Sequence, residues 1–113
     1  MCSNGYIMYI KTLDDKNFDN ELMNSNGFFL IDFWADWCNP CMALLPILEE
    51  LSVEYKGVIL FGKINVDINL DIPKRYNVMS IPTLILFKDG VLVDRKIGSV
   101  SKLDILNFID LNR

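Results

Sequence analysis

Two of the three cysteines, Cys38 and Cys41, stand close together in the stretch DFWADWCNPCMALLP. Such a pair can hold half of a metal site, close a structural loop, or form a disulfide that is made and broken during a reaction. A structural zinc site needs four ligands, and the chain has no histidine and only Cys2 beyond the pair. So short a loop stabilises a fold by about 2 kcal/mol, against about 3 kcal/mol for a 15-residue loop. We therefore expect no metal, and redox chemistry is favoured.

The position of the pair gives this redox chemistry a physical basis. Cys38 is predicted where a strand gives way to a helix, so its sulfur faces unpaired backbone N–H groups and the positive end of the helix dipole. Both stabilise the thiolate, which makes Cys38 the nucleophile. Cys41 follows within the first helical turn, where it can meet Cys38 while shielded from solvent. Pro40, near the first helical position, restricts the backbone at no cost in hydrogen bonds.

The apolar pattern predicts strands and helices that would position this pair, in the order βαβαβαββα. The predicted strands are Tyr6 to Lys11, Phe28 to Trp34, Val58 to Val66, Thr83 to Phe87 and Val91 to Ile97. The first predicted helix is capped by Asp14 and Asp15 and runs to about Met23, and the second runs from Pro40 to about Tyr55. A short third helix is predicted around Asp71 to Tyr76. The last helix begins with a capping box at Ser101 and runs through Ile109.

The connections between these elements define the fold class. Helices between the first three strands imply parallel crossovers, whereas Asp89-Gly90 predicts an antiparallel hairpin between the last two strands. The run Phe28 to Trp34 is apolar except for Asp32, which is typical of a strand covered on both faces. We therefore predict an α/β protein with a central mixed five-stranded sheet and helices on both faces.

Length and charge set the remaining bounds. The 113 residues suffice for one domain, and the net charge of -4 comes without a basic stripe, so direct nucleic-acid binding is not expected. No apolar stretch approaches the roughly 20 residues that span a membrane. The first residues lack a secretory signal, so we expect the protein to lie in the cytoplasm. We also expect it to be a monomer. Residues 1–7 are interpreted as a leader before a domain at residues 8–113, with Met1 or Met8 as the start and Cys2 in the leader.

Several segments together resemble the thioredoxin family from about Met8 to Leu111. They are DFWADWCNPC (Asp32 to Cys41), Pro46, Lys63 in GKINVD, IPTL (Ile81 to Leu84), LFKDG (Leu86 to Gly90) and IGS (Ile97 to Ser99). The resemblance implies the thioredoxin fold and a protein disulfide reductase, in which Cys38 forms a mixed disulfide and Cys41 resolves it. It also implies partners: a separate NADPH-dependent thioredoxin reductase, and substrates such as reductases that form a disulfide in turnover. The chain has no glycine-rich dinucleotide motif, so no cofactor of its own is expected.

The resemblance also assigns roles to two charged residues. Asp32 corresponds to the buried carboxylate that helps to take the proton from Cys41, and desolvation should raise its pKa. Lys63 is its expected partner. The alternatives are a core aspartate that is satisfied by hydrogen bonds and a lysine that points into solvent.

Substrate binding is assigned by the resemblance to residues around the pair. Pro82 resembles the family's cis-proline, beside which the backbone of Ile81 and Pro82 pairs with the substrate chain. Trp37 is the expected exposed contact, and Gly98 is expected to keep the surface flat. Met79 is expected to extend an apolar rim, together with Trp37, Pro40, Met42 and Ile81. Asp67 and Asp71 are interpreted as solvated surface acids.

The sequence departs from the family pattern at two positions near the pair. Asn39-Pro40 replaces the usual Gly-Pro, and a neutral change of this kind should leave the protein a reductant, with a potential below about -200 mV. Met42 replaces a common lysine, which predicts weaker electrostatic discrimination among partners. Two other functions stay open. One is a binding scaffold within a larger complex, and the other, less favoured because of Pro40, is a thiol oxidase.

Overall fold

The computed structural model describes residues 9–98 and 100–113. In this part of the chain the strands are Ile10–Leu13 (β1), Phe28–Trp34 (β2), Ile59–Asn65 (β3), Thr83–Lys88 (β4) and Val91–Ile97 (β5). The helices are Phe18–Met23 (α1), Asn39–Glu54 (α2), Asp71–Arg75 (α3) and Lys102–Leu111 (α4). The predicted element order and α/β class are confirmed.

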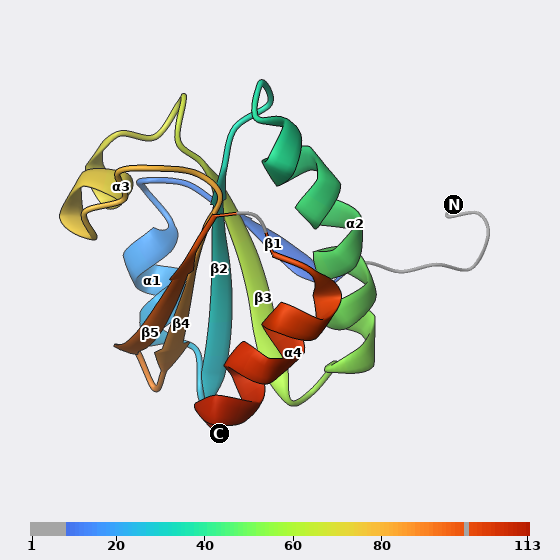
Figure 1. The fold of residues 1–113 in the computed structure, drawn as a ribbon. Coiled ribbons are helices and arrows are strands. Elements are labelled where there is room, and N and C mark those ends of the chain that lie inside the picture. Colours follow the sequence, from blue (N-terminus) through green and yellow to red (C-terminus); the bar gives the residue numbers. More distant parts are fainter. Residues whose placement is uncertain (1–8, 99) are drawn as a thin grey trace, which may run out of the picture.

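The strands form one mixed sheet in the order β1-β3-β2-β4-β5. The first three strands are parallel, β4 is antiparallel to β2, and β5 is antiparallel to β4. Helices α2 and α4 cover one face of the sheet, and α1 and α3 cover the other (Figure 1). Strand β2 lies at the centre of the sheet and pairs with β3 and β4, so the strand that precedes the cysteine pair is held on both sides.

Each face of the sheet has its own hydrophobic core. The core under α2 and α4 includes Leu30, Leu44, Leu48, Leu51, Phe61, Leu84, Ile105 and Ile109. The core under α1 and α3 includes Phe18, Leu22, Phe29, Phe33, Ile64, Ile72 and Phe87. The second core packs closely around Gly62, where a Cβ would lie 2.8 Å from Leu13 Cδ1 and 2.9 Å from Phe29 Cε1. Only glycine fits there without moving its neighbours.

Most predicted boundaries agree with the structure. Strands β2 and β5 have the predicted bounds, α2 and β3 differ by one residue at each end, and the capping box at Ser101 is confirmed by its hydrogen bonds with Asp104. The proposed leader, Cys2, the start of the first predicted strand and Ser99 lie outside the described residues. The described strand β1 continues to Leu13 because Thr12 and Leu13 still pair with β3.

The predicted cap of the first helix is wrong. Helix α1 begins at Phe18 after Asn17, whose side chain makes no capping hydrogen bond. The Asp14 carboxylate accepts from the N–H groups of Lys16 and Asn17 in the turn before the helix. Asp15 faces a different helix, α3, far away in the sequence. Sequence-local reasoning cannot find such a partner, because the fold alone brings it near.

A search for membrane-spanning elements gives a negative result for the described ranges. No helix in residues 9–98 or 100–113 is both long and apolar enough to cross a bilayer.

Candidate active site

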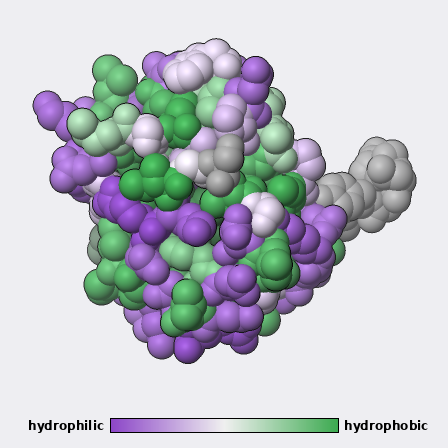
Figure 2. Space-filling view, viewed as in Figure 1, coloured by the Kyte–Doolittle hydropathy of each residue, from purple (hydrophilic) through white to green (hydrophobic). Residues whose placement is uncertain are grey.

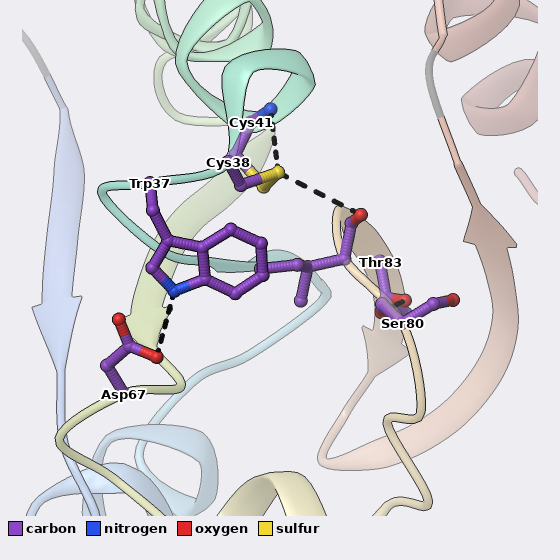
Figure 3. The surroundings of a disulfide bond; sticks show 7 residues. Trp37, Cys38, Cys41, Asp67, Ser80 and Thr83 are labelled. Carbon is purple, nitrogen blue, oxygen red and sulfur yellow. Dashed lines mark hydrogen bonds between the residues drawn. A yellow bond between two sulfur atoms is a disulfide. The ribbon is translucent and has the colours of Figure 1, made fainter.

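The two cysteines lie at the start of α2 and form a disulfide (Figure 3). Cys38 is the N-cap residue, with extended backbone dihedral angles, and its Sγ accepts a hydrogen bond of 3.2 Å from the N–H of Cys41. The predicted placement of Cys38 at the helix start is therefore confirmed. The side chains of both cysteines are buried, with 4% of Cys38 and 1% of Cys41 exposed. A partner sulfur must approach Cys38 closely, while Cys41 stays behind it.

Asp32 lies on the sheet face that α2 covers. Its register partners are Lys63 on β3 and Leu84 on β4, and alternation places it on the same face as Leu30, which packs against α2. The side chain is 1% exposed, and neither carboxylate oxygen has a hydrogen-bond partner among the described residues. Burial raises the pKa of Asp32 to about 7, although the positive charge of Lys63 opposes the rise. This carboxyl can therefore gain or lose a proton near neutral pH.

Lys63 is next to Asp32 in register but makes no direct ion pair with it within the described residues. Its ammonium Nζ stands 5.2 Å from the centre of the Trp34 ring, in a cation–π arrangement. The side chain is half-buried. Lys63 therefore acts on the aspartate through its charge, without a direct ion pair, and its half-buried side chain does not simply point into solvent.

Trp37 is held in place by a residue that sequence reasoning missed. Its side chain is 67% exposed, and its indole Nε1 donates to Asp67 Oδ1 at 3.2 Å (Figure 3). Asp67 is exposed, as interpreted from the sequence, but its hydrogen bond with Trp37 was not predicted. A signal was available, since Asp67 follows β3 as Trp37 follows β2, and neighbouring parallel strands end at the same edge of the sheet.

The loop that carries Asp67 is fastened to the start of the chain's first helical region. Asn69 Oδ1 accepts from the N–H of Asp15, and Asn69 Nδ2 donates to the carbonyl of Asn65. The Asp15 carboxylate in turn accepts the N–H groups that open α3, those of Leu70, Asp71 and Ile72, at 3.0, 3.1 and 2.9 Å. Four of these hydrogen bonds connect Asp15 to residues 69–72, and the fifth, from Asn69 to Asn65, lies within the loop that follows β3.

The segment opposite the disulfide contains a cis peptide bond between Ile81 and Pro82. The carbonyl oxygen of Ile81 lies 3.9 Å from Cys38 Sγ. The carbonyl of Pro82 accepts from the N–H of Gly98 at 2.9 Å. Gly98 has a φ of +96°, and a Cβ there would meet nothing within 4 Å, so backbone conformation and not crowding favours glycine. The structure thus brings all three residues to one side of the disulfide.

An apolar hollow of about 390 Å³ opens beside the disulfide. We call it the disulfide hollow, and it is lined by Trp37, Val66, Val78, Met79, Ser80 and Ile81. The predicted apolar rim therefore exists in part, with Trp37, Met79 and Ile81 in it. Met42 is 41% exposed on α2 but does not line this hollow. Val66 and Val78 were not predicted, because short loop segments give no periodic signal.

The described residues contain no cluster of three or more His, Cys, Asp or Glu side chains that could hold a metal ion. The groups that the site brings together are one disulfide, one buried carboxyl with a pKa of about 7, and an apolar hollow.

Comparisons with known proteins agree with this arrangement. Residues 9–111 match the model of the thioredoxin family. The chain is 48% identical to a thioredoxin of Buchnera aphidicola subsp. Acyrthosiphon pisum over 100 residues, which are 88% of this chain and 93% of that protein. It is 39% identical to a thioredoxin of Pseudomonas aeruginosa over 104 residues, 92% and 96% of the two chains. A thioredoxin of Rickettsia felis is 45% identical over 96 residues, 85% and 91% of the two chains.

Proposed function

The chain belongs to the thioredoxin family, and we propose that it is a general protein disulfide reductase of the cytoplasm. As a member of this family it is a protein disulfide oxidoreductase that acts by dithiol–disulfide exchange through Cys38 and Cys41. Thioredoxins need no cofactor of their own. The observation that carries the proposal is the disulfide at the N-terminus of α2, in which Cys38 is the N-cap residue and Cys41 lies within the first helical turn.

The reaction consists of two exchanges. The Cys38 thiolate attacks one sulfur of the substrate disulfide, forms a mixed disulfide and expels the other substrate sulfur as a thiolate. The Cys41 sulfur, after losing its proton, attacks Cys38 Sγ. The mixed disulfide then breaks, the second substrate thiolate leaves, and the Cys38–Cys41 disulfide remains. Two electrons pass from the protein to the substrate.

Asp32 supports the second exchange by accepting the proton of Cys41. Its position on the face under α2, its lack of hydrogen-bond partners among described residues and its pKa of about 7 favour this role. Lys63 limits the rise of that pKa and keeps the carboxyl able to ionise. The N–H of Cys41 supports the first exchange because it donates to Cys38 Sγ and stabilises the thiolate.

The substrate contacts are assigned to residues around the disulfide. Trp37, Met79 and Ile81 offer apolar surface in the disulfide hollow, and the backbone beside Pro82 is placed to pair with an extended substrate segment. Gly98 leaves open space above its own backbone.

Membership of the thioredoxin family supports a proposal for the physiological partners. A thioredoxin reductase that uses NADPH would restore the reduced form, and enzymes that form a disulfide in turnover would consume it. This would make the protein an electron carrier in cell redox homeostasis. Asn39 and Pro40, both exposed at the start of α2, leave the pair without a neighbouring cation that would favour an oxidant.

Insulin reduction with dithiothreitol tests the proposal. We expect turnover by the wild type and by Cys2→Ser, and no turnover above background by Cys38→Ser, because serine cannot form the mixed disulfide. The potential of the wild type should lie below about -200 mV. Catalysis that survives in Cys38→Ser would instead support a non-catalytic scaffold, and a potential above that limit would support a thiol oxidase.

A further inference from the structure

The disulfide hollow continues into a second hollow along α3. We call this the α3 hollow, and it is lined by Val66, Asn69, Leu70, Pro73, Lys74, Asn77, Val78 and Met79, with a volume of about 350 Å³. Val66, Val78 and Met79 line both hollows. The two therefore form one continuous surface that begins beside the reacting disulfide and ends on α3.

Large apolar side chains are exposed along this surface. Leu70 is 71% exposed and Met79 is 91% exposed, while Pro73 forms a buried wall. Figure 2 shows hydrophobic side chains reaching the surface at the upper left, on the side where Figure 1 places α3. Exposed apolar surface costs free energy that a bound apolar group would recover, and the unbranched methionine can adapt to different groups.

The backbone under Leu70 is held firmly, so its exposure is built into the fold. Its N–H donates to the Asp15 carboxylate at 3.0 Å, and the next two N–H groups also donate to that carboxylate. Asn69 is buried and fixed by hydrogen bonds at both ends of its side chain. A surface that is already ordered loses little conformational entropy when a partner binds.

We propose that Leu70 and Met79 form a second substrate subsite, which takes an apolar side chain from the same chain segment as the attacked disulfide. The inference rests on the proposed reductase function, since that function requires a protein segment to lie against Cys38. A segment that crosses the disulfide hollow reaches Val66, Val78 and Met79, and these residues lead directly into the α3 hollow. The substrate class is therefore disulfide proteins with an exposed leucine, methionine or similar side chain near the reactive cysteine.

The chain offers a matched pair of variants for a test. Leu70→Ser removes one exposed apolar side chain from the lining of the α3 hollow, whereas Ile68→Ser removes a neighbour on the same loop. Ile68 is 79% exposed and does not line the α3 hollow; it lines another hollow with Asp14, Asp15 and Lys16, which meets the α3 hollow only at Asn69. Both side chains are exposed, so equal thermal unfolding of both variants is expected.

The probes are peptide disulfides in a glycine and serine background, with a single leucine moved stepwise away from the cysteine. For the wild type, at least one leucine position should lower KM about fivefold relative to the peptide without leucine, with kcat unchanged. Leu70→Ser should remove this gain, and Ile68→Ser should keep it. Glutathione disulfide, which is too small to reach the α3 hollow, should be reduced equally by all three proteins.

Three results would overturn the subsite. The first is that no leucine position lowers KM, and the second is that both variants lose the gain equally. The third is a concentration-dependent dimer of the wild type in sedimentation velocity that Leu70→Ser abolishes, since a second copy would then be the occupant. If the wild type reduces neither the peptides nor glutathione disulfide, the proposed function itself fails, and the subsite fails with it.

Discussion

Two aspartates of this chain occupy regions that treat a carboxylate in opposite ways. Asp32, on the sheet face under α2, is 1% exposed, and its oxygens accept no hydrogen bond from the described residues. Asp15, between β1 and α1, is partly exposed, and its carboxylate accepts three backbone N–H groups that open α3. The first carboxylate accepts no hydrogen bond from the described residues and has only the nearby charge of Lys63, whereas the second accepts three hydrogen bonds.

The difference separates the reacting part of the molecule from the part that supports it. A buried carboxyl without donors prefers the neutral form and changes its charge readily when a proton is offered nearby. A carboxylate that accepts several N–H groups instead fixes the backbone that supplies them. The reacting groups therefore lie on β2 and α2. The hydrogen bonds between Asp15 and the start of α3 hold in place the loop that carries Asp67 and the α3 hollow.

The largest expected effect comes from making the buried carboxyl permanently neutral. In Asp32→Asn the free energy of unfolding should exceed that of the wild type by about 2 to 4 kcal/mol at about pH 8. The reason is that the pKa of Asp32 in the folded protein is about 7, raised by burial from the ordinary value of 3.8 for an aspartate. Unfolding in urea, followed by far-UV circular dichroism, measures the difference.

The pH dependence fixes the sign of this effect. Between about pH 4 and pH 7 the folded wild type holds a proton that the unfolded chain has lost, so its stability falls as pH rises. The advantage of Asp32→Asn should therefore appear above about pH 4 and level off above about pH 7. Asp36→Asn, at an exposed position, is the matched control and should change stability by less than about 0.5 kcal/mol. An Asp32→Asn variant less stable than the wild type at about pH 8 would contradict the claim that the buried Asp32 carboxylate destabilises the folded protein.

The supporting region should respond with the opposite sign. Asp15→Ala leaves three N–H groups of α3 without their acceptor, and the free energy of unfolding should fall by about 2 kcal/mol. Asp14→Ala is the control, because its carboxylate bonds only within the local turn, and it should cost about 1 kcal/mol or less. The same urea titrations measure both variants. Equal losses would show that the junction with α3 contributes nothing beyond a local turn.

The sequence predicted the reacting region better than the supporting one, for a physical reason. Cys38, Cys41 and Asp32 lie on adjacent elements, β2 and α2, whose boundaries follow from the run of apolar residues and from Pro40. Their relation is therefore local. Asp15 and Asp67 act on partners that are distant in sequence, and their roles depend on which loops the sheet brings together. Composition and spacing alone cannot distinguish such acids from solvated ones. For Asp67 the parallel pairing of β2 and β3 must be considered as well, and for Asp15 the contact arises only from the fold.

The smallest expected effect tests whether surface charge matters in the reacting region at all. Met42 is 41% exposed one residue after Cys41, and Met42→Lys adds a cation there. Exposed charges interact weakly and are screened by salt, so we expect rate changes of about twofold that favour acidic over basic protein substrates and fade at about 1 M salt. Steady-state kinetics with matched acidic and basic substrates measures this, with Met42→Gln as the neutral polar control. Unchanged discrimination in Met42→Lys would contradict the hypothesis that the missing lysine weakens the choice among partners. It would also strengthen the contrast with Asp32, because an exposed charge would then have no measurable effect where burial shifts a pKa to about 7.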